Sequence, residues 1–392
     1  MRKYAERIGA IQPFRVMALL AEARALEAAG RDIVHMEIGE PDFPTPAPVT
    51  RAAVQAIETG DMHYTPALGL PALRERIAVF YQQRYGVRVA AQRIVVTPGA
   101  SGALLLALGV VLDAGEAVMM ADPGYPCNRN FVRFLGGVPQ VVNVDAATEY
   151  QLNAALVEQH WTGHGGSQTR ALMLASPSNP TGTLIDEQAL AEMTGIVAQK
   201  NGALIVDEIY HGLTYDREPV TALAFSDDTF VINSFSKYFG MTGWRLGWLV
   251  APEDAIEHID KLAQNLFLAA PTPAQHAALA AFEPENLQIL EQRRQQFQQR
   301  RDYLLPALRE LGFDLPVTPQ GAFYLYAGCE TLTDDSFAFA QTLLQEAGVA
   351  VTPGRDFGDN QPEKYLRFSY TTSMDRLEEG VQRLRQFLRG YG

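Results

Sequence analysis

The strongest constraint on the fold is a regular alternation of short apolar runs with helical stretches between residues 72 and 250. Continuous apolar runs of this kind are typical of strands buried on both faces of a sheet. Strands that alternate with helices form a mostly parallel sheet, because each helix returns the chain to the start of the next strand. The sequence therefore predicts an α/β fold, with a mostly parallel sheet sandwiched by helices. We expect strands at residues 93–97, 117–121, 138–144, 171–175, 203–206 and 229–232, and a further one ending at residue 250.

Residues suited to ligand binding follow several of these expected strands. Thr97, Ala121, Asn179, Asp207 and Lys237 each fall just after an apolar run. Open α/β sheets bind their ligands beyond the carboxyl ends of the strands. We therefore expect these positions to converge on one crevice.

The last part of the chain has a different pattern, with short expected strands at residues 323–326 and 366–370 between helices. This pattern predicts a smaller α+β domain, and 392 residues are enough for about two or three domains. We place the large domain at residues 46–285 and form the small domain from residues 1–45 together with 286–392. Helices are expected at residues 14–29, 71–85 and 285–311.

Composition excludes several classes of protein. The net charge of −13 gives no overall attraction to nucleic acid or to an anionic membrane. Two cysteines, Cys127 and Cys329, give no disulfide framework and suit a reducing compartment. The longest apolar run, residues 103–112, is too short to span a bilayer. With no signal peptide after the basic first residues, we expect a cytoplasmic protein without nucleic-acid or membrane partners.

Two clusters of side chains invite other functions. His160 and His164 could suggest a metal, but no further ligands stand at metal-binding spacing, so we expect no metal site. The long helix at residues 285–311 carries Arg293, Arg294, Arg300 and Arg301. We interpret these arginines as a solvated face balanced by nearby acids, rather than a nucleic-acid surface.

The stretch from residue 234 to residue 248 combines groups that bind an anion with a reactive amine. Ser234 and Ser236 can donate to an anion, and Arg245 can bind a phosphate with its planar fork. Lys237 then lies beside fixed positive charge, which disfavours its protonation and leaves a nucleophilic amine. This arrangement suits pyridoxal phosphate held as a Schiff base. The alternative is an ordinary surface lysine after a strand.

The same stretch resembles the lysine motif of the class I/II aminotransferases, which are fold-type-I, aspartate-aminotransferase-like pyridoxal-phosphate enzymes. The motif reads Ser-x-Ser-Lys, then a short turn containing glycine, then Gly-x-Arg-x-Gly, and it is intact here. The resemblance extends over nearly the whole chain. It implies pyridoxal 5'-phosphate as cofactor and a ping-pong transfer of an amino group from an L-amino acid to a 2-oxo acid. Lys237 would be both the Schiff-base lysine and the proton shuttle.

Several cofactor-binding residues follow from local pattern and from the resemblance together. The glycine turn and helix start after residue 97 offer backbone N–H groups to a phosphate at Ala100, Ser101 and Gly102. Tyr125 occupies the position where the family stacks an aromatic ring on the cofactor, as suits a planar, electron-poor ring. By resemblance, Tyr64 would reach the cofactor phosphate of a neighbouring subunit, which requires a homodimer.

Three polar residues at strand ends would bind the cofactor ring. Asn179 lies in the family's Asn-Pro-x-Gly signature and could donate to the phenolic oxygen. We predict a cis bond between Asn179 and Pro180, as found in tight functional turns. Asp207 would keep the pyridine nitrogen protonated, with an N-cap of a following helix as the alternative. Tyr210 would donate to the phenolic oxygen.

The sequence indicates the substrate-binding residues less clearly than the cofactor-binding residues. By resemblance, Gly39 would lie beside the substrate carboxylate and Arg367 would bind it, with a structural salt bridge as the competing use of Arg367. Gly39, Phe14, Tyr125 and Phe323 suggest a partly apolar pocket for alanine, branched or aromatic substrates. Glutamate and 2-oxoglutarate are expected as one substrate pair. A carbon–sulfur β-lyase on the same fold and a non-catalytic effector-binding module are the alternatives.

Overall fold

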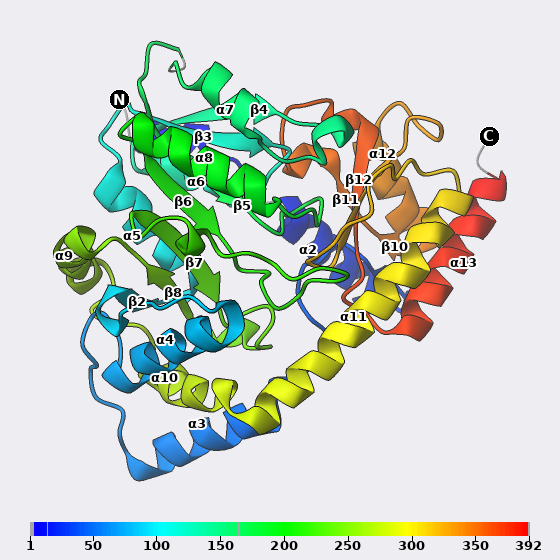
Figure 1. Ribbon diagram of the computed structural model, residues 1–392. Coiled ribbons are helices and arrows are strands. Elements are labelled where there is room, and N and C mark those ends of the chain that lie inside the picture. Colours follow the sequence, from blue (N-terminus) through cyan, green and yellow to red (C-terminus); the bar gives the residue numbers. More distant parts are fainter. Residues whose placement is uncertain (1–3, 14, 163–164, 391–392) are drawn as a thin grey trace.

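The computed structural model describes residues 4–13, 15–162 and 165–390 (Figure 1). Within these residues, seven strands form one sheet, here called the main sheet, in the order β2-β8-β7-β6-β5-β3-β4. Strand β8 is antiparallel to β2 and β7, and the remaining neighbours are parallel. The predicted α/β fold is therefore confirmed. The strands are β2 (Ile94–Thr97), β3 (Ala117–Asp122), β4 (Val138–Asn143), β5 (Thr169–Ala175), β6 (Ala203–Asp207), β7 (Thr229–Ser234) and β8 (Gly247–Val250).

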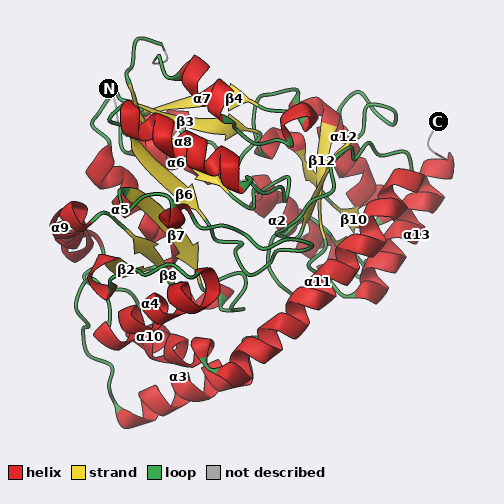
Figure 2. Ribbon diagram, in the orientation of Figure 1, coloured by secondary structure: helices red, strands yellow, loops and turns green. Residues whose placement is uncertain are grey.

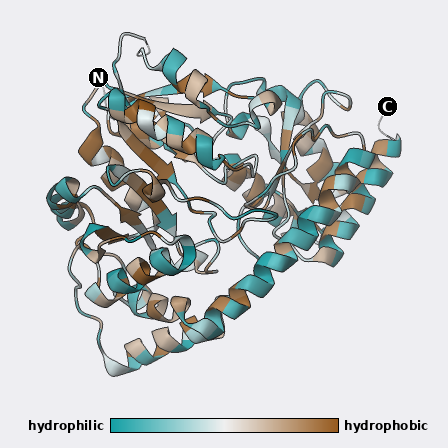
Figure 3. Cartoon of the chain, in the orientation of Figure 1, coloured by the Kyte–Doolittle hydropathy of each residue, from teal (hydrophilic) through white to brown (hydrophobic). Residues whose placement is uncertain are grey.

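Helices cover both faces of the main sheet, because alternate residues of each strand point to opposite layers. Val206 joins the core that includes α4, α8 and α10, whereas Ile205 joins the core with α5, α6 and α9. Figure 3 shows apolar strands in the interior and polar outer surfaces on helices such as α9. The helices of this part are α3 (Ala47–Thr59), α4 (Pro71–Tyr85), α5 (Gly99–Val111), α6 (Pro126–Phe134), α7 (Ala154–His160), α8 (Glu187–Gln199), α9 (Ile256–Leu266) and α10 (Thr272–Leu279).

A second core forms around an antiparallel sheet with the order β11-β12-β9, here called the small sheet (Figure 2). The N-terminal segment joins this part, since β1 pairs in parallel with β10. That pairing fits the predicted small domain, whose boundaries at residues 45/46 and 285/286 stay a prediction. The elements are α1 (Arg7–Ala10), α2 (Arg15–Ala28), β1 (Val34–His35), α11 (Pro284–Glu310), β9 (Tyr324–Gly328), α12 (Ser336–Thr342), β10 (Val349–Ala350), β11 (Thr352–Pro353), β12 (Tyr365–Ser369) and α13 (Met374–Gly390).

The arginines of α11 differ from the prediction of a solvated face. Arg300 and Arg301 are each only 4% exposed. Arg300 forms a two-pronged ion pair with Asp42 at 2.8 and 2.9 Å. Arg301 pairs with Asp216 at 2.7 Å and with an adjacent aspartate. The prediction is wrong for these two because the N-terminal segment covers Arg300 through Asp42 and Phe43, and the loop after β6 covers Arg301 through Tyr215 and Asp216.

Other expectations have simple outcomes. The Asn179–Pro180 bond is cis as predicted. Cys127 and Cys329 are both free. Among the residues described, no helix has the length and apolar character needed to cross a bilayer. Phe14 and His164 lie outside the described residues.

The aromatic cluster beneath β8 provides a test of the main-sheet core. Trp248 is fully buried, packs edge-to-face against Phe235 with ring centres 4.9 Å apart, and donates from Nε1 to the hydroxyl of Tyr81 at 3.1 Å. We expect Trp248→Ala to lower stability by about 3–5 kcal/mol, because it leaves a large cavity and removes this hydrogen bond. Thermal unfolding followed by circular dichroism measures the effect. Phe134→Ala, at an exposed ring, is the control, and equal midpoints for both variants would contradict the assigned packing.

Candidate active site

The carboxyl ends of the main-sheet strands face a cavity of about 570 Å³, which the small sheet closes from the other side. Most of the predicted site residues line it, although they come from seven separate segments of the chain. Of the five strand-end residues expected to converge on one crevice, Asn179, Asp207 and Lys237 line this cavity, whereas Thr97 and Ala121 do not. The predicted residues at the cavity are Gly39, Ala100, Ser101, Tyr125, Asn179, Asp207, Tyr210, Ser234, Ser236, Lys237, Arg245 and Arg367.

Lys237 follows β7 and extends into this cavity. Its Nζ donates to the backbone oxygen of Gly39 at 2.6 Å. Burial lowers the pKa of the Lys237 amine to about 8, and the positive charges of Arg367 and Arg245 act in the same direction. Desolvation, rather than the neighbouring positive charge expected from the sequence, is the larger cause of this lowered pKa. Near neutral pH, a useful fraction of this amine is therefore unprotonated and nucleophilic.

Asp207 is the last residue of β6, and the pKa of its carboxyl is raised, whereas that of the Lys237 amine is lowered. Burial raises the pKa of its carboxyl to about 6, although the N–H of Ile209 and the charge of Lys237 favour the ionised form. Its Oδ1 accepts that N–H at 3.0 Å. No helix begins here, since turns follow β6, so the alternative of a helix N-cap fails. A buried carboxylate with a free edge toward a cavity suits a cationic partner.

One end of the cavity is built to bind an anion. The N-terminus of α5 presents the backbone N–H groups of Ala100 and Ser101. Arg245 lies opposite and donates from Nη1 to the Ser236 hydroxyl at 3.4 Å. Gly99 makes this approach possible, because a side chain there would come within 2.7 Å of the Arg245 guanidinium. Helix dipole, hydroxyl and guanidinium therefore converge as in a phosphate site.

Ser234 shares this wall but also fixes its shape. Its hydroxyl donates to the backbone oxygen of Leu246 at 3.2 Å and accepts the N–H of Ser236 at 3.0 Å. The loop that carries Lys237 is thus closed onto the strand that follows it. The hydroxyl of Ser234 organises the loop as well as lining the cavity.

Two tyrosine hydroxyls meet above the strand ends. Tyr210 and Tyr324 share a hydrogen bond of 2.8 Å between their buried hydroxyl groups. Gly39 passes directly against this pair, and a side chain at residue 39 would come within 1.9 Å of the Tyr324 hydroxyl oxygen. Glycine at position 39 therefore allows the loop to bring its backbone oxygen to Lys237.

Arg367, in β12, is a buried cation that binds neutral groups. It donates to Oδ1 of Asn179 at 2.9 Å and to the backbone oxygen of Glu37. Its guanidinium lies between the rings of Tyr324 and Phe357, at 4.3 and 4.8 Å from their centres. Among the described residues, no carboxylate forms an ion pair with it, so the alternative of a structural salt bridge finds no partner there. A carboxylate ligand would supply the missing charge.

Some predicted residues lie elsewhere, and some lining residues were missed. Gly102 is buried within α5, and Tyr64 is 85% exposed, so neither lines the cavity of this chain. Tyr324, the first residue of β9, lines the cavity rather than the predicted Phe323, which lies in the turn just before that strand. Val16 and Met17 of α2 were also missed, since nothing local marks them as cavity residues.

Comparison with known proteins agrees with this site. A profile of the family described as aminotransferase class I and II matches residues 31–384. The chain is 38% identical to (5-formylfuran-3-yl)methyl phosphate transaminase of Methanocaldococcus jannaschii, over 96% of this chain and 97% of that protein. It is 37% identical, with the same coverage, to valine–pyruvate aminotransferase of Mycobacterium tuberculosis. A crystal structure of an aminotransferase from Mycobacterium tuberculosis superposes with a TM-score of 0.95 at 37% identity, covering 100% of both chains.

The chain therefore belongs to the class I and II aminotransferase family. It is a transaminase, and members of this family use pyridoxal 5'-phosphate.

The residues at the cavity fit this cofactor. The anion-binding end is suited to its phosphate, the amine of Lys237 to its aldehyde and the carboxylate of Asp207 to its ring nitrogen. Asn179 uses its oxygen on Arg367, which leaves the amide hydrogens to donate to a phenolic oxygen. The phosphate, the aldehyde, the ring nitrogen and the phenolic oxygen of the cofactor would each have a partner of suitable charge or hydrogen-bonding type in this cavity.

The lowered pKa of Lys237 predicts how the cofactor-free protein captures pyridoxal 5'-phosphate. Only the neutral amine attacks an aldehyde, so the capture rate should rise about tenfold per pH unit up to about 8 and then level off. Stopped-flow absorbance at several pH values measures the rate. Nα-acetyllysine, whose amine titrates near 10.4, controls for titration of the cofactor itself. A protein rate that rises in parallel with this control past pH 9 would contradict the assignment.

Proposed function

We propose that this transaminase accepts the amino group of a neutral, largely apolar L-amino acid and passes it to a 2-oxo acid by a ping-pong mechanism. The observation that carries this proposal is the set of charges at the cavity. Within the described chain, Lys237, Arg245 and Arg367 are the only cationic residues that line it. The cofactor aldehyde, the phosphate and the substrate α-carboxylate engage all three, so none remains for a carboxylate on the substrate side chain.

The remaining wall supports the same substrate class. Val16, Met17 and Ile38 line the cavity near the substrate end, and the ring of Tyr324 closes it. Glu40 also lines it, and its negative charge opposes a second carboxylate. A branched or other apolar side chain fits a wall of this composition.

In the proposed mechanism, Arg367 orients the substrate. Its guanidinium accommodates a carboxylate with two parallel hydrogen bonds, because Tyr324 and Phe357 prevent the planar group from rotating. Because Lys237 lines the same cavity, its amine would be available to the Cα of a substrate held in this way. With its pKa lowered to about 8, this amine is a base of suitable strength to remove the Cα proton and to return a proton.

Other residues prepare the ring. When bound, the cofactor supplies a ring that withdraws electrons from Cα. Asp207 would hold the proton on the ring nitrogen, and Tyr210 and Asn179 would donate to the phenolic oxygen. Ser234, Ser236, Arg245 and the start of α5 would bind the phosphate and fix the tilt of the ring.

The names of the relatives set the range of substrates to test. One similar protein is named for valine and pyruvate and another for a furan phosphate, so similarity alone does not choose the donor. Valine is a neutral, branched amino acid and agrees with the wall of this cavity. The expected pair of glutamate and 2-oxoglutarate stays a prediction, since its distal carboxylate lacks a cationic partner among the lining residues of one chain.

We also propose that the active unit is a homodimer in the cytoplasm, with Tyr64 reaching the partner's site. Tyr64 is too exposed for a tyrosine with a purely structural role, and other apolar side chains on nearby elements are exposed with it. These include Val54 and Ile57 on α3, Met62 beside Tyr64, and Val79 on α4.

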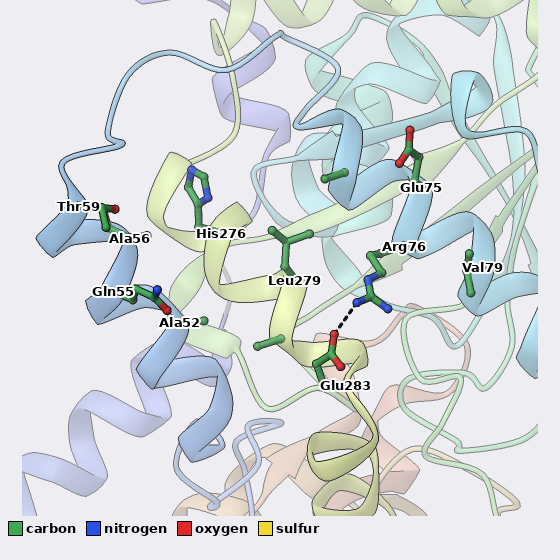
Figure 4. Close-up of a pocket in the computed structure, with 12 residues that line it drawn as sticks. Ala52, Gln55, Ala56, Thr59, Glu75, Arg76, Val79, His276, Leu279 and Glu283 are labelled. Atoms are coloured by element: carbon green, nitrogen blue, oxygen red, sulfur yellow. Dashed lines mark hydrogen bonds and ion pairs between the residues drawn. The ribbon is translucent and has the colours of Figure 1, made fainter.

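A surface groove adjoins this segment (Figure 4). It encloses about 800 Å³ between α3, α10 and α4 and is largely apolar, with alanines, Val79 and Leu279 in its lining. His276 on its edge forms an ion pair of 3.6 Å with Asp61, close to Tyr64 in sequence. A hydrogen bond of 2.9 Å from the Thr272 hydroxyl to the backbone oxygen of His63 also joins α10 to the segment that carries Tyr64. For the groove and this segment together, we propose a second copy of this chain as the occupant.

The donor is tested by titrating the purified protein with amino acids while no acceptor is present. We expect valine, alanine and other neutral amino acids to convert the visible band of the lysine-bound cofactor to the pyridoxamine form at concentrations about tenfold or more below those needed for aspartate or glutamate. Absorbance spectra give the conversion directly. Preference for aspartate or glutamate would refute the assignment of a neutral donor.

Two controls separate the reaction types in this test. Lys237→Ala should still bind the cofactor but lose proton transfer, and near-normal turnover by this variant would refute the role of Lys237. Persistence of the visible band while pyruvate and ammonia accumulate would instead identify a β-lyase.

The dimer is tested with Leu279→Arg, which places a charge in the groove. We expect this variant to elute as a monomer and to release pyridoxal phosphate faster, because the partner's Tyr64 no longer reaches the phosphate. Size exclusion with light scattering and the decay of the visible band measure both effects. Phe134→Arg, at an exposed ring away from the groove, should remain dimeric. A wild-type protein that is monomeric at micromolar concentration would refute the proposal.

A further inference from the structure

Glu208, the residue after Asp207, carries a second carboxyl group that has no part in the mechanism above. Glu208 is fully buried. Its Oε1 accepts the backbone N–H of Ala222 at 2.8 Å. Because side chains alternate at the end of β6, Asp207 lines the cavity whereas Glu208 points to the opposite layer, toward α4.

The other oxygen of Glu208 faces a buried histidine. Oε2 lies 3.4 Å from Nδ1 of His211, and the hydroxyl of Tyr85 lies 3.1 Å from the same nitrogen. Burial lowers the pKa of His211 to about 3, so its imidazole is neutral. One hydrogen between these two atoms, carried by Oε2 or by Nδ1, makes the contact attractive, and the burial of both side chains favours the arrangement in which neither group is charged.

No cation compensates a charge on Glu208. The ionisable groups that face this pair are Asp207 on the same strand, Tyr81 and Tyr85 on α4, and the more distant Arg84. Arg84 is engaged by Glu218 at the surface, at 2.9 Å. Among the described residues, no Lys or Arg forms an ion pair with Glu208. An ionised carboxylate here would be both desolvated and adjacent to Asp207.

We propose that Glu208 is a neutral carboxylic acid paired with neutral His211, and that this pair positions the turn that presents Asp207 and Tyr210 to the cofactor. The backbone of the turn supports the pairing. The N–H of Glu208 donates to Ile232 on β7, and the N–H of His211 donates to the oxygen of Glu208, both at 2.8 Å. The side-chain pair therefore closes a turn of which Tyr210 is a member.

The protonation of Glu208 complements that of Asp207. Burial raises the pKa of Glu208 to about 8, and the charge of Asp207 acts in the same direction. Near pH 7, Asp207 is thus the ionised member of two adjacent carboxyl groups. The pair holds the turn without adding a second negative charge beside the cofactor site.

The proposal is tested through the pH dependence of stability in Glu208→Gln, using the full chain saturated with pyridoxal phosphate. The pKa of Glu208 in the folded protein, about 8, lies above the ordinary value of 4.5 for a glutamate carboxyl. Its contribution to stability is therefore fully present below pH 4.5 and is lost as pH rises toward 8. Glutamine does not titrate, so the melting temperature of the variant minus that of wild type should increase steadily between pH 5 and pH 8.

Glu218→Gln is the matched control, because it makes the same change at an exposed side chain near the same cluster. Its melting temperature should follow that of wild type across this pH range. A Glu208→Gln variant that melts below wild type at pH 7 by an amount independent of pH would show an ionised Glu208 and overturn the proposal.

The positioning role is tested by the rate at which variants of Glu208 release the cofactor. If Glu208 only stabilised the fold, Glu208→Gln would not specifically restore the release rate that Glu208→Ala changes. We expect Glu208→Ala to release pyridoxal phosphate about tenfold faster than wild type, and Glu208→Gln to restore the wild-type rate and the wild-type pH dependence of the visible band. Equal release rates for Glu208→Ala and wild type would overturn this role. Because melting temperatures do not depend on turnover, failure of this inference and failure of the proposed reaction are distinguishable.

Discussion

The burial of the Arg367 guanidinium without an acidic partner in the described chain is the constraint on which the rest of the site depends. Its hydrogen bonds go to an amide oxygen, a backbone carbonyl and the hydroxyl of Thr352, which orient the group but carry no negative charge. The first two partners belong to the turn after β5 and the segment after β1, while Tyr324 belongs to the small sheet. The Arg367 guanidinium thus connects three distant segments of the chain and can still bind the carboxylate of a substrate.

Desolvation acts in opposite senses on the two catalytic groups of the cavity. It raises the pKa of Asp207 to about 6 and lowers that of Lys237 to about 8, because the charged form of each is disfavoured in a poorly hydrated space. Near neutral pH, the acid is largely ionised and the amine is largely protonated but easily deprotonated. One physical effect therefore prepares both a charged partner for the cofactor ring and a reactive amine.

Much of this arrangement could be predicted from the sequence, because strand ends of a mostly parallel sheet converge. Asn179, Asp207 and Lys237 are marked by apolar runs directly before them, and their positions follow from the fold class alone. Residues that reach the cavity from helices or from the small sheet carry no such mark. Val16 reaches it through the position of α2, and Arg300 is buried through contacts with residues more than 200 positions away. Tertiary packing of this kind leaves no local pattern.

Asp207 and Glu208 are neighbours in the sequence, but the alternation of side chains along the strand places their carboxyl groups in different environments. Two buried carboxyl groups on neighbouring residues repel each other strongly if both are ionised. At the end of β6, one side chain points to the cavity and the other to α4, so their environments differ although their backbones are continuous. Asp207 has a free edge and a cationic neighbour in Lys237, whereas Glu208 has a backbone N–H and an imidazole. The strand thus supplies a charged carboxylate for chemistry on one face and a protonated one for packing on the other.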